Sequence, residues 1–558
     1  MAGYLSAIRR GLLSGVIQNT LTGSTTLTST VTLCSINAVI SGSSGLTKGG
    51  PGIVVFNTTP TYTGLTTINQ GTLCYGVEPI GNAGLFPSAN ALTIAAGATF
   101  LSKGNSSSVT AITGTITATG GDFRYSGTGN ALLNFASAST YNWPASGGTF
   151  GNFYLYCTGT GATTRGIQCS VVGKTIINVT AKNIYINGNV GGKSATALMY
   201  WLFDTSAVNG PQTHLCSFAR ASTNYGITTY VINAGTGTVT LGDCTATAGT
   251  MWAPGGVVQG MTINAGTINY ASTNGNTSTV NAATIFFNAS TTASITSTSI
   301  WNSTAASLTE IVLAGSGTTN ITATQTAGNT GAMMVLTGGG TLNLSSTITG
   351  GAASSIQVGL ASGSITATGG ASGQNVITTA STTGVAIGQK ISGTGIGVAA
   401  FVQSFVANTS VTISTTLTAT ASGTYTLTGG AGLFIGTGTV ATTATTLSSG
   451  SNVQGGTANA TPGTLTFASL TMAGGGINVG TNGTTTVSTI ALTGTLDVSG
   501  GCVVNLLNTI SAAGTYTLTT GATALTGTSA NVSLGTNSSG RTFSSFQFSG
   551  NNLQIVLT

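Results

Sequence analysis

Ile68-Asn69-Gln70-Gly71-Thr72-Leu73 is a short motif that this chain repeats. It consists of an aliphatic residue, an Asn-x-Gly sequence typical of a tight turn, and the start of a new alternating run. The motif returns with small changes at 232–236, 263–268 and 280–285. Each copy therefore predicts a buried strand end, a turn and a second strand, in coils separated by irregular intervals.

Charged residues are rare throughout the sequence. The 558 residues include 12 basic and 6 acidic side chains, together with 85 glycines, whereas an ordinary domain is about 25% charged. In a stack of strands each side chain lies about 4.8 Å from its counterpart in the next strand. Two like charges at that distance repel by about 0.9 kcal/mol in water. Neutral Thr, Ser and Asn columns avoid this repulsion and can hydrogen-bond along the stack, so the composition favours a stacked β-coil.

The apolar pattern predicts a folded chain rather than a flexible Gly/Ser-rich linker. Hydrophobic residues make up 40% of the sequence. They recur in short alternating runs bounded by Gly, Asn or Ser, which is typical of strands and turns; examples are 99–101, 112–116, 239–241 and 342–344. We expect coils of about 20 to 25 residues.

Two segments near the N-terminus carry a family resemblance. Residues 45–54 contain Lys-x-Gly-x-Gly, and 62–73 contain Tyr-Thr-Gly followed by Ile-Asn-x-Gly-Thr-Leu. In this order they resemble the passenger-associated repeat of autotransporter adhesins. The segments 513–518 and 550–557 look like the terminal coils of such passengers. The resemblance implies a right-handed parallel β-helix.

A second resemblance lies between Val376 and Leu427. The segments 382–396, 411–414 and 419–424 are similar to a small β-module of phage tail-fibre and other virion structural proteins. The expected fold is all-β: a right-handed parallel β-helix (solenoid) and a small inserted β-module, as the two resemblances imply, with a short N-terminal helix that the first residues predict. The expected division is a helical cap or attachment peptide at 1–22, β-helix with the passenger-like repeat at 23–140, an aromatic- and Lys/Arg-enriched β-region at 141–230, β-helix at 231–372, the phage-type module at 373–430 and C-terminal coils at 431–558.

The first residues predict a short amphipathic helix. Leu5, Ile8, Leu12 and Val16 form one apolar stripe. This helix either caps the first coil against edge-to-edge stacking or docks on a neighbouring subunit or particle. Gly and Ser interrupt the apolar stretch after Arg9 and Arg10, so it is a poor secretory signal. There is also no apolar run of about twenty residues, so we expect no membrane insertion.

The region 141–230 holds 13 of the 36 aromatic residues and the only histidine, His214. Large flat side chains can contact a sugar or a partner subunit, but core packing in a widened coil is the favoured interpretation. His214 is expected to be a satisfied core or turn residue. The candidate contact residues are Trp143, Tyr154, Tyr156, Tyr200, Trp201 and Phe203.

Catalytic groups are sparse. Glycan-cleaving enzymes use paired carboxylates, but the acidic residues lie far apart, and Asp204 with Asp243 is the one pair that adjacent coils could unite. The single histidine and the absence of Cys-x-x-Cys disfavour a zinc site or a His-dependent triad. The seven cysteines read as small buried hydrophobes, and a net charge of +6 is too thinly spread for nucleic-acid binding. We expect no enzyme activity, cofactor or metal.

These observations lead to a functional hypothesis. The chain is expected to be a structural, adhesive virion protein of a bacteriophage: a tail fibre, spike or particle-decorating fibre. Its expected partners are copies of itself, with a trimer as one arrangement, other virion proteins and a host surface glycan. The main alternative is a secreted or cell-surface adhesin or a self-assembling extracellular filament subunit. A glycan depolymerase is the third class.

Overall fold

In the residues that it describes, the computed structural model consists of β-strands, turns and one short 3-10 helix at Ser529–Asn531. It describes residues 19–558 except for 22, 31, 77–85, 106–107, 129–131, 136, 158–166, 170–172, 188–189, 193–196, 216–225, 243–259, 272–283, 297–309, 327–332, 351–353 and 398. The expected N-terminal helix, with Leu5, Ile8, Leu12 and Val16, lies outside the described residues. The chain forms two compact units, Met1–Val258 and Gln259–Thr558, called unit 1 and unit 2 below.

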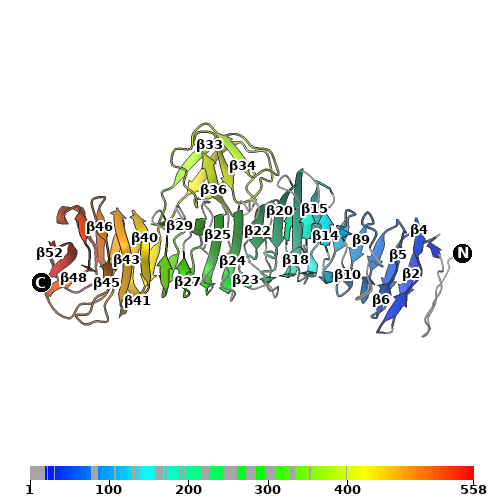
Figure 1. Cartoon of the computed structure of the whole chain (residues 1–558), viewed down its shortest axis with the longest axis horizontal. Helices are drawn as coiled ribbons and strands as arrows, with labels where there is room; N and C mark the ends of the chain where they lie inside the picture. Colours follow the sequence, from blue (N-terminus) through cyan, green and yellow to red (C-terminus); the bar gives the residue numbers. More distant parts are fainter. Residues whose placement is uncertain are drawn as a thin grey trace. The chain divides into compact units, whose positions relative to one another are not determined.

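Unit 1 is built from parallel strands, each paired with a strand one repeat later (Figure 1). One series is β2 (Thr25–Thr28), β5 (Leu46–Gly49), β7 (Thr66–Ile68), β9 (Leu92–Ile94) and β12 (Ile116–Ala118). The other is β3 (Cys34–Ile36), β6 (Ile53–Phe56), β8 (Thr72–Tyr75), β10 (Thr99–Asn105), β13 (Asp122–Thr128), β16 (Phe150–Cys157) and β18 (Gly173–Asn187). From β5 to β10 the chain visits the two series alternately. The repeat length is not constant: Ile53 pairs with Thr72, whereas Phe123 pairs with the more distant Phe153.

The Asn-x-Gly motif forms the turn between β7 and β8. Gly71 has φ +65°, and a Cβ there would lie 2.4 Å from the carbonyl oxygen of Gly52. Only glycine meets both demands. The turn prediction is also confirmed at Gly235 (φ +59°), which follows β22 (Gly226–Asn233).

The turn prediction is wrong at 263–268. These residues lie inside β24 (Gly260–Ala271), which continues past the motif with a register shift between Ala265 and Thr267. The partner strand advances three residues, from Ala289 to Thr292, while β24 advances two, from Ala265 to Thr267; this bulge-like irregularity keeps the motif within the strand, so no turn is needed. In the fourth copy, 280–283 lie outside the described residues, and β25 (Thr284–Ile295) begins directly after them.

Lys48, in the Lys-x-Gly part of the passenger-like segment, is fully buried. Its Nζ donates hydrogen bonds to the carbonyl oxygens of Gly49 (2.8 Å), Gly50 (2.7 Å) and Gln70 (3.0 Å). Burial lowers its pKa. The ammonium group therefore ties the 69–71 turn to the coil before it and places no charge on the surface.

The interior of unit 1 is a column of aligned apolar side chains. Phe100, Phe123 and Phe153 occupy equivalent positions on β10, β13 and β16, and all three are buried. Their rings lie 5.1 Å and 5.4 Å apart at interplanar angles of 29° and 14°. Inward side chains therefore repeat along the stack in the same way as outward ones.

Unit 2 contains further parallel series and an antiparallel body (Figure 1). One series is β25, β26 (Glu310–Leu313), β29 (Met333–Leu336), β32 (Ser355–Val358), β40 (Thr439–Ser448) and β43 (Thr464–Ala473). Another is β27 (Thr318–Ile321), β30 (Thr341–Leu344), β39 (Leu433–Gly436), β41 (Asn452–Ala458), β44 (Gly476–Val479) and β47 (Cys502–Leu506). The chain ends in an antiparallel sheet of β48 (Gly514–Thr517), β52 (Phe543–Ser549) and β53 (Asn552–Leu557).

Asparagine ladders connect equivalent strands, as the neutral-column argument predicts. The side-chain Nδ2 of one Asn donates to the Oδ1 of the Asn one repeat earlier. The pairs in unit 2 include Asn288 to Asn264 (2.8 Å), Asn343 to Asn320 (2.9 Å) and Asn505 to Asn478 (3.0 Å).

An antiparallel barrel occupies residues 363–428. Its strands are β33 (Gly363–Gly369), β34 (Val376–Thr379), β35 (Lys390–Ser392), β36 (Ala400–Val406), β37 (Ser410–Ile413) and β38 (Gly423–Thr428). The module expected at 373–430 overlaps this barrel, which begins earlier, at Gly363, because β33 pairs with β38 and closes it. Ile365, Ile377, Val411 and Tyr425 lie in its own apolar core.

The barrel covers the outer face of β25, β26 and β29. Phe401 of the barrel stacks on Phe286 of β25 at 5.2 Å and 15°, and both belong to one buried cluster with Val312 and Val335. These strands are therefore buried on both faces, which explains their continuous apolar runs.

Glu310 is a buried carboxyl group beside this contact. It is 7% exposed, and the hydroxyl of Thr284 donates a hydrogen bond to its Oε2 at 3.2 Å. The same hydroxyl lies 3.4 Å from the carbonyl oxygen of Gln403 in the barrel. Burial raises the pKa of Glu310 from an ordinary 4.5 to about 7, partly opposed by the Thr284 hydrogen bond.

The turn at Gly71 yields a stability prediction. Gly71→Ala should lower the free energy of unfolding by more than about 2 kcal/mol, because it combines a positive φ with a backbone clash. Gly97→Ala is the matched control: Gly97 has φ +74° and nothing within 4 Å of its Cβ position, so it should cost about 1 kcal/mol. Denaturant unfolding measures both, and equal effects would contradict the clash argument.

Glu310 yields a pH prediction. The folded protein holds the proton more tightly than the unfolded chain, so the stability of unit 2 should fall as pH rises from about 4.5 to 7, by about 3 kcal/mol. Glu310→Gln should remove this decline. Unfolding followed between pH 4 and 8 by the fluorescence of a probe on unit 2 tests it. A variant as pH-dependent as the parent chain would show that Glu310 is not the responsible group.

Candidate binding surface of unit 1

Three neighbouring strands, β13, β16 and β18, present an ordered outer face. Side chains along each strand alternate between buried and more exposed positions, and the registers align the exposed ones in three columns. We call these nine residues the Tyr–Asn face. The first column is Asp122, Asn152 and Asn183; the second is Arg124, Tyr154 and Tyr185; the third is Ser126, Tyr156 and Asn187.

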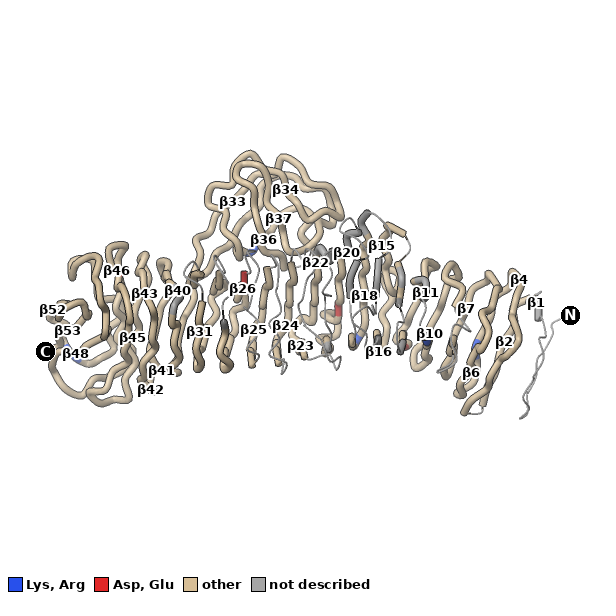
Figure 2. The backbone as a smooth tube through the Cα atoms, in the orientation of Figure 1, with Lys and Arg blue, Asp and Glu red and all other residues tan. Residues whose placement is uncertain are grey.

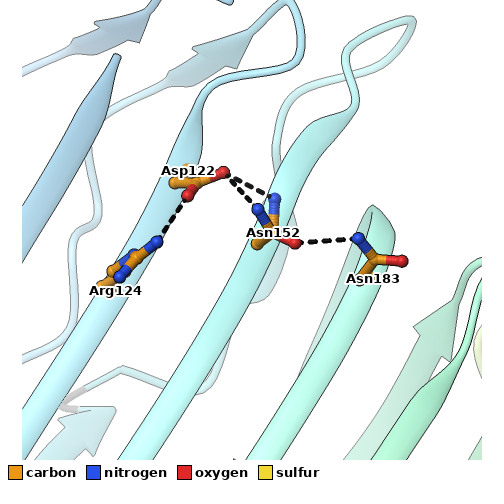
Figure 3. A network of polar contacts seen from close by, with 4 residues as sticks. All are labelled: Asp122, Arg124, Asn152 and Asn183. Atoms are coloured by element: carbon orange, nitrogen blue, oxygen red, sulfur yellow. Dashed lines mark hydrogen bonds and ion pairs between the residues drawn. The ribbon is translucent and has the colours of Figure 1, made fainter. Parts of the chain in front are cut away.

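The first column is a hydrogen-bonded ladder headed by a carboxylate (Figure 3). Asp122 Oδ1 accepts hydrogen bonds from the backbone N of Asn152 at 2.9 Å and from its Nδ2 at 2.8 Å. Asn183 Nδ2 then donates to Asn152 Oδ1 at 2.8 Å. The charge of Asp122 is tolerated here because its neighbour along the stack is a neutral donor.

Arg124 joins the first column to the second. Its Nη2 lies 2.8 Å from Asp122 Oδ2 (Figure 3), and its guanidinium carbon lies 4.5 Å from the centre of the Tyr154 ring. The cation therefore contacts both a carboxylate and a π-face. Its charge is compensated, and it fixes the orientation of Tyr154.

Three tyrosines stack on this face: Tyr154 and Tyr185 along the second column, and Tyr156 beside them in the third. Tyr154 and Tyr185 lie 4.8 Å apart at 12°, and Tyr154 and Tyr156 lie 5.8 Å apart at 25°. Tyr154 has Arg124 on one side and Tyr185 on the other, and partial burial raises its pKa. Tyr156 is the most accessible of the three, at 37% exposed. The face thus offers phenol groups beside a row of amides, which suits a ligand rich in hydroxyl groups.

The six aromatic residues singled out in the sequence separate into two groups. Trp143, Tyr200, Trp201 and Phe203 are at most 4% exposed and pack in the interior, where the Trp201 and Phe203 rings stack at 5.0 Å. Core packing, the favoured interpretation of this region from the sequence, is confirmed for these four residues. Only Tyr154 and Tyr156 face outward, and both belong to the Tyr–Asn face.

Sequence reasoning missed most of this surface. Arg124 and Asp122 precede the region 141–230, and Tyr185 and Asn183 were not singled out within it. The alternation of side chains along a strand was one usable signal. Phe153 and Leu155 are apolar and are expected to face the core, which places Tyr154 and Tyr156 on the opposite face of the same strand. The residues that lie beside these tyrosines on the neighbouring strands could not be identified without knowing the strand register.

The remaining polar candidates that the structure describes, Asp204 and His214, each make local contacts of their own. Asp204 Oδ1 accepts hydrogen bonds from the backbone N and hydroxyl of Ser206, and Asp243 lies outside the described residues. His214 is buried against Tyr230, whose hydroxyl lies 3.1 Å from Nδ1, and burial lowers the pKa of His214 to about 3. Within the described ranges, no group of three or more His, Cys, Asp or Glu side chains is placed to hold a metal ion.

Two further findings concern membrane-spanning helices and similarity to known proteins. None of the helices among the described residues is long and apolar enough to cross a membrane. Comparison with protein-family models, curated proteins and solved structures finds no match.

Proposed function

We propose that the chain is a structural and adhesive protein in which a right-handed parallel β-helix displays the Tyr–Asn face to a surface glycan of a host cell. The observation that carries this proposal is the alignment of phenol, amide and guanidinium groups on three consecutive strands. A carbohydrate presents many hydroxyl groups, which such an array can hydrogen-bond.

The β-helix is supported by the strand registers within each unit. Parallel partners in unit 1 lie one repeat apart along the chain, as in the pairs Ile53 with Thr72 and Phe123 with Phe153. The chain also alternates between strand series as it advances. Each strand is templated by the one before it, which gives a rigid scaffold. A flat, preformed surface on such a scaffold loses little conformational entropy when a ligand binds.

A bacteriophage fibre, spike or particle-decorating fibre is the setting we propose. It is favoured by the similarity of segments 382–396, 411–414 and 419–424 to a virion β-module, and these segments lie in the antiparallel barrel. In this setting the partners are copies of the chain, other virion proteins and the host glycan. A secreted or cell-surface adhesin would use the Tyr–Asn face in the same way, and is the second candidate.

The proposal predicts glycan binding that depends on Tyr156. Tyr156→Ala should weaken binding of the full chain to immobilised host-surface polysaccharide about tenfold, because an aromatic contact of about 1.4 kcal/mol is lost. Phe405→Ala is the control, since Phe405 is an aromatic of similar exposure, 39%, on the barrel.

Surface plasmon resonance measures both variants against the parent chain. Equal losses in both variants, or none in Tyr156→Ala, would contradict the assignment of the site. Release of shortened oligosaccharides from the polysaccharide would instead favour a depolymerase.

A further inference from the structure

Two lysines border the Tyr–Asn face. Lys103 on β10 pairs in register with Ser126 of β13, so it extends the third column by one strand. Lys182 directly precedes Asn183 and is exposed. A Cβ added at Gly120 would lie 4.0 Å from Lys182 Nζ, so this ammonium group lies near the turn that leads into Asp122.

The charges of these lysines are available to a ligand. Among the described residues the one ion pair joins Arg124 to Asp122, so neither ammonium group has a described carboxylate within 4 Å. The positive charges of Lys103, Arg124 and Lys182 outnumber the single negative charge of Asp122, so the local net charge is +2. The chain has 12 basic residues in 558, and of these Lys103, Arg124 and Lys182 lie on β10, β13 and β18; Figure 2 marks the charged positions along the backbone.

Their placement brackets the tyrosines. Lys103 belongs to the column that contains Tyr156, whereas Lys182 lies beyond the Asp122–Asn183 column at the opposite edge. Lys103 on β10 and Lys182 on β18 are also three strand steps apart, so the face between them extends about 13 Å along the strands and about 14 Å across them. Arg124 adds no free charge between them, because Asp122 already compensates it.

We propose that the Tyr–Asn face binds an acidic oligosaccharide, with its carboxylate groups near Lys103 and Lys182 and its hydroxyl groups on the phenol and amide rows. This inference rests on the proposed function, because it names the class of glycan that the same surface takes. The charge complementarity of the rim carries it. A neutral glycan would leave both ammonium groups without a counter-charge.

The test compares each of three acidic oligosaccharides with its own methyl ester, in which the negative charge of the carboxylate is removed. The probes are oligogalacturonate, oligomannuronate and oligosialate, each beside its carboxyl methyl ester, presented to the full chain at low and high salt. At least one free acid should bind about tenfold more tightly than its ester at low salt, and added salt should reduce the difference.

The variants locate the effect. Lys103→Gln/Lys182→Gln should weaken binding of the acid about tenfold and leave binding of the ester unchanged. Lys390→Gln is the control: it removes one exposed positive charge on the barrel and should change neither. Circular dichroism and thermal unfolding of all variants verify that the fold is intact.

The outcomes separate this inference from the proposed function. If the esters bind as tightly as the acids through Tyr156, the acidic class is wrong and the glycan site stands. If no acid, ester or host polysaccharide binds, both are wrong. If single-stranded nucleic acid competes more strongly than every acid and does so through the two lysines, the surface recognises polyanions in general, and the carbohydrate assignment is overturned.

Discussion

Each side chain of the stacked strands lies next to its counterpart one repeat away, and this registration is the constraint on which the other features depend. A residue type that recurs at one position of each repeat forms a column. The contact between neighbours in the column, favourable or unfavourable, is therefore repeated along the stack. Apolar columns such as Phe100, Phe123 and Phe153 fill the interior. Amide ladders such as Asn343 with Asn320 and Asn505 with Asn478 join neighbouring repeats. Like-charged columns would add repulsion at every step, so a chain of this kind is nearly free of ionised residues.

The few charged residues are placed in ways that respect this constraint. Lys48 is hidden inside and satisfied by three carbonyl oxygens. Glu310 lies under the barrel, where burial raises its pKa to about 7, and its register neighbours Thr284 and Met333 are uncharged. Asp122 is followed along the stack by an amide that donates to it. Charge that remains on the outside therefore stands out, and the lysine rim of the Tyr–Asn face is the clearest instance.

Much of the fold was predictable, because composition and turn chemistry act locally. The neutral ladders and the turn at Gly71 followed from the sequence. The motif at 263–268 did not form a turn, because a bulge inside a long strand accommodates the same residues, and that choice depends on the neighbouring strand. The apolar runs 311–313 and 334–336 are buried in strands that are covered on both faces, and nothing local in the sequence identified the barrel as the cover. The binding surface was only partly predictable: alternation could place Tyr154 outward, but its partners Arg124 and Tyr185 come from the strands one repeat before and one repeat after it.

The most direct test of the registration constraint is a double-mutant cycle at Asn320 and Asn343, whose amides are hydrogen-bonded at 2.9 Å. Asn320→Asp alone should be tolerated, because Asn343 still donates to it, as Asn152 does to Asp122. Adding Asn343→Asp should produce a destabilising coupling of about 1–3 kcal/mol at pH 7, which disappears below about pH 4, where both carboxyl groups are protonated. Additive effects that do not change with pH would contradict the claim that registered columns exclude like charges.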